Sequence, residues 1–224
     1  MKKLKIAIDG PCAAGKTTMA KLLAKELDVP YIDTGSLYRA VAYFLKANNI
    51  AEASVVEALP NIQLKLTHKG KVWMNGLVIN DAVLRTPEIA MCASNISAVP
   101  EVRNFLLETQ RETARENGGV MEGRDTTTVV MPNADMKFYL TAAPLVRAKR
   151  RMADLQAAGT PMELPEVLAA LNTRDYQDMH REIAPLKQTD SQIYIDNSHL
   201  SAEQTFQKML MFISGQPRQN KKEK

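Results

Sequence analysis

The chain has 224 residues, of which 45% are hydrophobic and 24% charged, which is the balance of a globular domain large enough to fold without disulfide bonds. Its formal net charge is +4, but residues 215–224 hold four lysines and arginines against one glutamate, a net of +3, which leaves +1 for the rest. This distribution predicts a basic, disordered tail over 215–224 rather than a charged face for nucleic acid.

The cysteine pattern favours a reducing compartment. Cys12 and Cys92 lie far apart and form no redox or metal-binding spacing. The apolar run that follows "MKKLK" is broken at Asp9, which argues against a signal peptide, and no window approaches the length of a membrane span. We expect a cytoplasmic monomer with neither nucleic acid nor a membrane as its partner.

Short apolar runs bounded by turn residues alternate with segments of helical spacing along the chain. The runs cover residues 4–8, 29–32, 118–121, 136–140 and 192–195, and the helical segments cover 16–27, 35–47, 100–117, 144–158 and 201–213. Continuous apolar runs of this length suit strands that are buried on both faces of a parallel sheet. Their alternation with helices predicts a doubly wound α/β core.

Two intervals depart from this alternation. Residues 61–80 alternate apolar and polar side chains and contain turn signals at "HKGK" and "MNG", which predicts a small antiparallel insertion. Residues 172–191 are dense in charges and contain Pro185, which predicts a mobile element outside the core.

The stretch "GPCAAGKT", residues 10–17, satisfies the P-loop pattern GxxxxGK[ST] between a predicted strand and a predicted helix. In such a loop the backbone N–H groups and the helix N-terminus face phosphate groups, Lys16 adds a positive charge and Thr17 can hold Mg²⁺. The strings NKxD and DxxG, by which a GTPase reads guanine and switches, do not occur in the chain.

Two further stretches follow predicted strands. In "YIDTGSLYRA" (31–40), Asp33 or Thr34 can cap a helix, and Arg39 is placed one turn later to hold an anion. In "VMEGRDTTTVVMP" (120–132), Arg124 can bind a phosphate with two N–H groups and Asp125 can accept hydrogen bonds from an amino group, while Glu122 can orient a water on Mg²⁺. A plain helix cap or a structural salt bridge is the alternative for each residue.

The stretch "RDYQDMHR" (174–181) places Arg174, Asp175, Asp178 and Arg181 at helical intervals of three and four. On its own, this spacing also fits a solvated helix stabilised by ion pairs.

Taken together, "IDGPCAAGKTT", "DTGSLYRA", "EVRNFLLETQRE", "GRDTTTVV", "FYLTA", "RAKRRM" and "RDYQDMHREIAPL" resemble the bacterial cytidylate kinases in order and spacing over almost all of residues 4–214. The resemblance implies the fold of a P-loop nucleoside monophosphate kinase, which is a five-stranded parallel sheet flanked by helices, with a small antiparallel insertion that binds the monophosphate and a helical lid. It implies a single kinase domain over 1–214, with its core at 1–60, 96–171 and 192–214, the insertion at 61–95 and the lid at 172–191.

The resemblance also implies transfer of the γ-phosphoryl group of ATP, with Mg²⁺, to CMP or dCMP. ATP would be bound by Gly10, Pro11, Cys12, Ala13, Ala14, Gly15, Lys16, Thr17 and Thr18. CMP would be bound by Thr34, Arg39, Ser94, Arg103, Arg124, Asp125, Asp178 and Arg181. Catalysis would fall to Lys16, Arg124, Arg174 and Arg181, and Mg²⁺ to Thr17 and, through water, Glu122.

Some positions depart from the pattern of this family. Gln177 and Met179 stand where many relatives have an arginine and a polar residue, Glu122 replaces the usual aspartate, and Thr126 and Thr127 replace an apolar residue and a glycine. Two alternatives remain open: a kinase for another small acceptor, such as dTMP, AMP or shikimate, and a regulatory protein that binds nucleotide without turnover.

Overall fold

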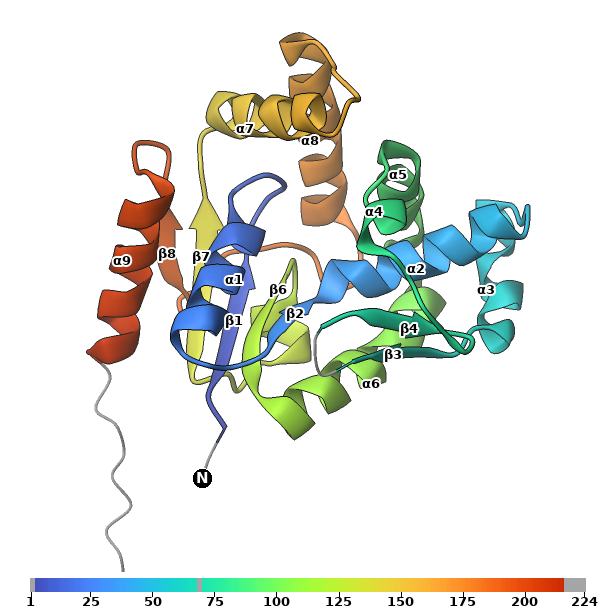
Figure 1. Cartoon of the computed structure of the whole chain (residues 1–224), viewed down its shortest axis with the longest axis horizontal. Coiled ribbons are helices and arrows are strands. Elements are labelled where there is room, and N and C mark those ends of the chain that lie inside the picture. The colour runs from blue at the N-terminus through green and yellow to red at the C-terminus, as the bar shows by residue number, and fades with distance from the viewer. Residues whose placement is uncertain (1–2, 68–69, 216–224) are drawn as a thin grey trace, which may run out of the picture.

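The structure, a computed structural model, describes residues 3–67 and 70–215 (Figure 1). Its central sheet contains β1 (Lys5–Asp9), β2 (Tyr31–Asp33), β6 (Gly119–Gly123), β7 (Met136–Thr141) and β8 (Ile193–Asp196). These strands lie in the order β2-β6-β1-β7-β8, and every neighbouring pair is parallel. The predicted five-stranded parallel sheet is therefore confirmed. The predicted tail lies, apart from Gly215, outside the described residues.

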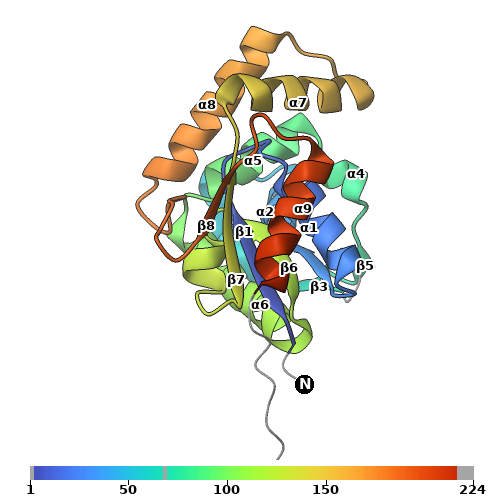
Figure 2. The same cartoon turned by 90° about the vertical axis from the view of Figure 1, so that its left-hand side faces the viewer.

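Helices cover both faces of this sheet (Figures 1 and 2). Helices α1 (Lys16–Glu26) and α9 (Ala202–Ser214) cover one face, and α6 (Pro100–Asn117) and a π-helical turn at Thr126–Val130 cover the other. Successive residues of β1 divide between the two sides, with Ile6 and Ile8 in the first cluster and Ala7 in the second. Burial on both faces explains why the inner strands β1, β6 and β7 are largely apolar.

The chain between β2 and α6 forms a second, smaller body. It contains α2 (Thr34–Ala47), a 3₁₀ turn (Glu52–Ser54), α3 (Val55–Ala58), a 3₁₀ turn (Leu59–Asn61), β3 (Leu64–Leu66), β4 (Val72–Met74), β5 (Leu77–Val78), α4 (Asp81–Leu84) and α5 (Pro87–Ile96). The three strands form the antiparallel sheet β3-β4-β5, which confirms the predicted insertion. Asn75 and Gly76 make its two-residue turn at φ 46° and 93°, whereas His68 and Lys69 of "HKGK" lie outside the described residues.

The insertion has its own apolar core, in which residues of α2, β4, α5 and α6 pack together: Leu37, Val41, Val72, Ile89 and Leu106. Helices α2 and α6 connect the insertion to the main sheet (Figure 1).

Helices α7 (Pro144–Ala157) and α8 (Leu164–His180) pack side by side beyond the carboxyl edge of the sheet (Figures 1 and 2). Their contact buries Ala148, Leu155, Val167 and Leu171. Helix α8 is continuous across residues 171 and 172, where the sequence placed the start of the lid. The charged stretch 174–180 is therefore the second half of a longer helix. None of the helices in the described part of the chain is long and apolar enough to cross a membrane.

Candidate active site

Three loops that are distant in sequence meet at the carboxyl edge of the sheet. Strand β1 leads into the P-loop at Gly10, β2 ends at Asp33 where α2 begins, and β6 ends at Gly123 just before Arg124 and Asp125. Because β2, β6 and β1 are parallel neighbours, their carboxyl ends lie next to one another. In open α/β sheets this edge is where ligands bind.

A cavity of about 360 Å³, here called the central cavity, opens between this edge, the insertion and α8. The structure brings together around it every residue that the sequence assigned to CMP, to catalysis or to the metal: Lys16, Thr17, Thr34, Arg39, Ser94, Arg103, Glu122, Arg124, Asp125, Arg174, Asp178 and Arg181. The loop residues Cys12, Ala13 and Thr18 line it as well. Six further polar residues of its lining are not expected from the sequence: Asp33, Tyr38, Arg85, Ser97, Arg151 and Asp154.

A second cavity of about 300 Å³ lies against the same loop, between it, α7 and the start of α9. Lys16 and Thr17 line both cavities, so the P-loop is their shared wall. Asn197 donates to the carbonyl of Ala14 at 3.0 Å and accepts a hydrogen bond from Arg150 at 2.9 Å. These contacts tie the loop after β8 to the P-loop and to α7.

Three of the predicted ATP-binding residues shape the loop and are not part of the lining of these two cavities. At Gly10 a Cβ would lie 1.9 Å from the carbonyl oxygen of Leu140, so only glycine fits beside β7. The carbonyl of Pro11 accepts a hydrogen bond from Lys16 Nζ at 2.7 Å, and the carbonyl of Ala14 is the acceptor for Asn197 described above. Gly15 lines the second cavity.

Lys16 is buried at the junction of the two cavities. Burial lowers the pKa of its ammonium group, and the charge of Arg124 adds to the effect, so that the pKa is about 8. A phosphate anion at this position stabilises the charged form of a lysine.

One corner of the central cavity holds two arginines, Arg39 and Arg85, beside the carboxylate of Asp33. Arg39 Nη2 donates to Asp33 Oδ2 at 2.6 Å, and Thr34 Oγ1 donates to the carbonyl of Glu122 at 2.8 Å. Burial acts to raise the pKa of Asp33, but Arg39 and Arg85 outweigh it and hold that pKa below its ordinary value. Asp33 also caps α2 through the N–H of Ser36, as the sequence allowed.

Another part of the cavity lining is a buried network of alternating charges. Arg103 pairs with Asp125, and Arg181 lies 3.5 Å from Asp125 and 3.6 Å from Asp178. Arg124 Nε donates to Asp178 Oδ2 at 2.7 Å. Burial acts to raise the pKa of Asp178, but the surrounding arginines outweigh it and lower that pKa.

The buried network excludes a solvated helix face for part of the stretch 174–181. The side chains of Asp178 and Arg181 are buried and face the cavity, so they are not part of a solvated helix face. Ser94 Oγ donates to Gln177 Oε1 at 3.3 Å, which joins the insertion to α8.

Asp9 has a structural role that the sequence does not predict. Its fully buried carboxylate accepts hydrogen bonds from the N–H groups of Thr126 and Thr127 at 2.9 and 2.7 Å, and from Thr127 Oγ1 at 2.6 Å. Burial raises the pKa of Asp9 despite these donors. Gln192 also donates to Thr127 Oγ1, so the hydroxyl group of Thr127 has a role that a glycine would not fill. The only signal in the sequence is an acidic residue at the end of an apolar strand.

The residues around Lys16 fit a magnesium ion bound together with nucleotide. The hydroxyl of Thr17 and the carboxylate of Glu122 both line the central cavity. Tyr31 OH donates to Glu122 Oε1 at 2.7 Å and so orients this buried carboxylate. Mg²⁺ prefers oxygen ligands and is usually held by one or two protein groups, phosphate oxygens and water.

Comparison with known proteins agrees with this geometry. The family model described as Cytidylate kinase matches residues 6–215. The chain is 42% identical to a cytidylate kinase of Flavobacterium johnsoniae over 224 residues, which cover 96% of this chain and 97% of that protein. It is 43% identical to a cytidylate kinase of Caldicellulosiruptor bescii over 216 residues, which cover 94% and 95%.

Among solved structures, an uncharacterized protein from Eubacterium ventriosum matches with a TM-score of 0.54 at 12% identity, over 96% of this chain and 100% of that chain. At this identity the likeness concerns the fold alone. The family model spans the P-loop and every residue of the central cavity, and the sequence relatives cover nearly the whole chain. The chain therefore belongs to the cytidylate kinase family.

Proposed function

We propose that this chain transfers the γ-phosphoryl group of ATP to CMP or dCMP, giving ADP and CDP or dCDP. The observation that carries the proposal is that Lys16 of the P-loop and the buried Arg103–Asp125 pair line the same cavity. One end of this cavity suits the phosphates of a donor, and the other suits the polar edge of a base.

The chemistry at the phosphates needs charge neutralisation and alignment rather than a catalytic base. The second pKa of a phosphate monoester is about 6, so the acceptor is largely a dianion at neutral pH. Phosphoryl transfer passes through a loose transition state whose charge spreads over the equatorial oxygens. Lys16, Arg124, Arg174 and Arg181 supply the fixed positive charges. Mg²⁺, bound with ATP at Thr17 and through water at Glu122, would neutralise further charge on the phosphates.

Thr34 and Arg39 would hold the acceptor phosphate, together with Arg124. The Nε of Arg39 is buried and has no hydrogen-bond partner among the described residues, so a ligand oxygen would satisfy it. The ribose would lie near Asp178 and Arg181, which α8 brings to the same cavity.

Base selection would rest on Asp125, with Arg103 and Ser94 as its neighbours. Cytosine carries an amino group at C4, which can donate to a carboxylate, and acceptors at N3 and O2, which can accept from a guanidinium. Uracil presents a carbonyl oxygen at C4, and this oxygen would face the carboxylate without a hydrogen bond. Leaving a buried polar group unpaired is costly, so the pocket would favour CMP over UMP.

The adenosine of ATP would extend into the second cavity, because Lys16 and Thr17 form the wall between the two. The paired helices α7 and α8 would act as the lid that excludes water during transfer. A monomeric cytoplasmic enzyme is part of the same proposal. Both cysteines are free thiols, which supports a reducing compartment.

A coupled assay of ADP formation with Mg²⁺, ATP and a panel of CMP, dCMP, UMP, dTMP, AMP and shikimate tests this proposal. We expect CMP and dCMP to be the preferred acceptors. Preferred turnover of dTMP, AMP or shikimate would identify a different kinase. ATP binding without turnover of any acceptor would identify a regulatory protein.

A further inference from the structure

Asp125 stands at a position where an aspartate ordinarily caps a helix, but its carboxylate pairs with Arg103 instead. It directly precedes the π-helical turn Thr126–Val130, and its side chain makes no capping hydrogen bond within the described residues. An aspartate at this position commonly accepts a hydrogen bond from the second or third N–H group of the helix. The carboxylate of Asp125 also lies 3.5 Å from Arg181 and lines the central cavity.

Asp9, which lies on a different strand, caps the turn in place of Asp125. The N–H groups of Thr126 and Thr127, the first two of the turn, donate to Asp9 Oδ1 at 2.9 Å and to Asp9 Oδ2 at 2.7 Å. The first N–H groups of a helix have no acceptor within the helix, and a buried N–H group without an acceptor is costly. The fully buried carboxylate of Asp9 satisfies both groups and leaves that of Asp125 available to the cavity.

The negative charge of Asp9 acts in the same sense as its hydrogen bonds. Burial is the main cause that raises the pKa of Asp9, and the charge of Asp125 acts in the same direction. The two carboxylates therefore repel each other. This repulsion opposes any approach of the Asp125 carboxylate to the N–H groups of the turn, and so favours its place beside Arg103 and Arg181.

Asp9 also connects the two loops of the site. It is the last residue of β1, immediately before Gly10 of the P-loop, and it lies opposite Gly123 in the pairing of β1 with β6. Arg124 and Asp125 follow Gly123 directly. Asp9 is not among the described residues that line the central or the second cavity. An effect of Asp9 on a bound substrate must therefore pass through the residues that it holds.

We propose that Asp9 is a positioning residue for base selection, which caps the turn after Asp125 and thereby holds the carboxylate of Asp125 at the edge of cytosine. This inference rests on the proposed function, in which Asp125 accepts a hydrogen bond from the amino group of the base. Without the cap from Asp9, the carboxylate of Asp125 can accept from the N–H groups of its own turn, as capping aspartates do, and it then leaves the base. The structural alternative is that Asp9 only stabilises the fold, in which case its loss affects all acceptors alike.

The test compares kcat/KM for CMP and for UMP, with Mg²⁺ and ATP, in the wild type and in Asp9→Asn. Asparagine has the shape of aspartate, but it is uncharged and places an amino group against one of the two N–H groups that aspartate accepts from. We expect Asp9→Asn to reduce the ratio of kcat/KM for CMP to that for UMP by about tenfold or more, because a small displacement of a hydrogen-bonding group in a built polar site is costly. Asp9→Ser, which is smaller and keeps one acceptor oxygen, should reduce the ratio in the same direction if Asp9→Asn does not fold.

Thr127→Val is the matched control within the same buried network. It removes the hydroxyl group that donates to Asp9 Oδ2 at 2.6 Å and accepts from Gln192, but it keeps both of the backbone N–H groups that Asp9 caps. We expect this variant to have a lower unfolding midpoint than the wild type and the same ratio of CMP to UMP turnover. A fall in the ratio as large as that in Asp9→Asn would show that any loss in this network disturbs the base, which overturns the inference.

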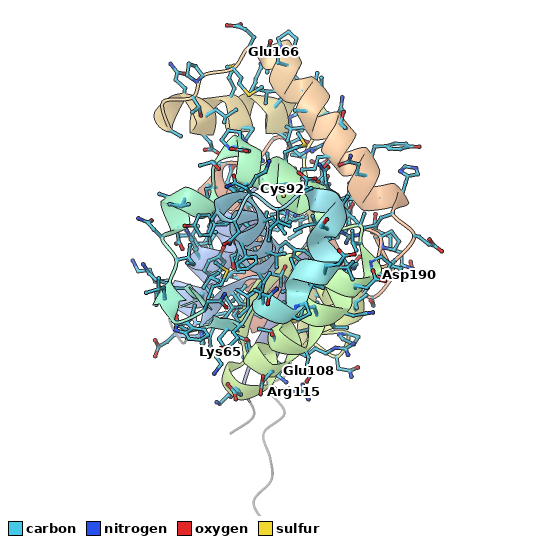
Figure 3. All side chains as sticks on the ribbon, turned by 90° about the vertical axis from the view of Figure 1, so that its right-hand side faces the viewer. Lys65, Cys92, Glu108, Arg115, Glu166 and Asp190 are labelled. Atoms are coloured by element: carbon cyan, nitrogen blue, oxygen red, sulfur yellow. The ribbon has the colours of Figure 1, made fainter. Side chains whose placement is uncertain are left out.

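Arg115→Ala is the surface control. Arg115 pairs with Glu108 on α6, the helix that also carries Arg103, and both lie at the opposite end of the molecule from Glu166 on α8 (Figure 3). This variant should change neither the ratio nor the unfolding midpoint.

A double mutant separates positioning from a general loss of structure. If Asp9 acts through Asp125, then Asp9→Asn should lower the ratio no further once Asp125 is replaced by alanine. The same fall in the ratio with and without Asp125, or an unchanged ratio in Asp9→Asn, would overturn this inference and leave the proposed function standing. If the wild type turns over no CMP, the proposed function and this inference fail together.

Discussion

Arg147 and Asp175 form a buried ion pair that holds one P-loop residue by both of its backbone polar groups. Asp175 Oδ1 accepts a hydrogen bond from the N–H of Cys12 at 2.9 Å, and Arg147 Nη1 donates to the carbonyl of Cys12 at 3.0 Å. The two side chains, 6% and 9% exposed, also pair with each other. Because Arg147 lies on α7 and Asp175 on α8, both helices of the proposed lid are hydrogen-bonded to the P-loop.

Asp175→Ala should therefore destabilise the protein and weaken ATP binding. The substitution leaves Arg147 buried without its counter-ion and removes the acceptor of the Cys12 N–H, which typically costs about 3–5 kcal/mol. We expect urea denaturation to show a loss of this size, and kinetics to show a raised KM for ATP with a smaller change for CMP. Glu108→Ala, which breaks an exposed ion pair, should change stability by no more than about 1 kcal/mol. Equal stability losses in the two variants would contradict this role.

Asp125→Ala should reduce the preference for CMP over UMP. The carboxylate of Asp125 is proposed to accept a hydrogen bond from the amino group of cytosine. Uracil has no amino group, so its binding does not include this hydrogen bond. We expect kcat/KM for CMP to fall by about 100-fold or more and that for UMP to fall much less, since a missing hydrogen bond in a built polar site is costly. Because Asp125 also pairs with Arg103, the unfolding midpoint of the variant should be measured alongside. An equal fall for both acceptors would count against Asp125 as the base reader.

ATP affinity should decrease as the pH rises above about 8. Burial and Arg124 lower the pKa of Lys16 to about 8, so in the free protein its ammonium group loses its proton above that pH. ATP favours the charged form, and affinity should drop by up to about tenfold per pH unit if only that form binds. Calorimetric titrations between pH 7 and 9.5 measure this slope, and Lys16→Arg should abolish it because arginine stays charged. A decrease that begins only near the ordinary lysine pKa of 10.5 would refute the prediction.

Alkylation of Cys12 should block ATP binding, and ATP should protect the thiol. Cys12 lines the central cavity and is partly exposed, whereas Cys92 is buried. Burial acts to raise the pKa of the Cys12 thiol, but Arg174, Arg124 and Lys16 outweigh it, so the pKa lies below its ordinary value and the reactive thiolate is favoured. We expect N-ethylmaleimide to label Cys12 first by mass spectrometry, more slowly with ATP present, and Cys12→Ser to resist inactivation. Labelled protein that retains full activity would disprove this prediction.

The strands, the P-loop and the β4–β5 turn can be predicted because each is encoded by a short run of neighbouring residues. Strands β1, β6 and β7 of the central sheet are largely apolar because both of their faces are buried, and the P-loop is a contiguous motif with glycine at Gly10 where no Cβ fits. The β4–β5 turn was readable from Asn75 and Gly76, which take positive φ angles. Such features depend on a few neighbouring residues, so a single sequence reveals them.

The parts that it missed depend on contacts between distant segments. Cys12 and Asp175 are separated by 163 positions, and Asp9 and Thr126 by 117. Nothing near either aspartate indicates its partner. Charged residues become frequent from residue 172 onward, yet packing of Val167 and Leu171 against α7 makes α8 one helix from Leu164 to His180, so the charge pattern does not show where this helix begins. Among the cavity residues, Ser94 and Arg103 have no local signal and are expected only from the family resemblance, and spacing alone leaves Asp178 and Arg181 compatible with a solvated helix face.

The most direct test of the central claim is to follow the phosphoryl group itself. Protein is incubated with Mg²⁺, CMP and ATP radiolabelled at its γ-phosphoryl group, and the products are separated by chromatography. The proposed reaction predicts label in CDP with the wild type, and formation of labelled CDP slower by on the order of a thousandfold with Arg124→Ala. Label that appears only in inorganic phosphate, or labelled CDP formed equally fast by Arg124→Ala, would contradict transfer at this cavity.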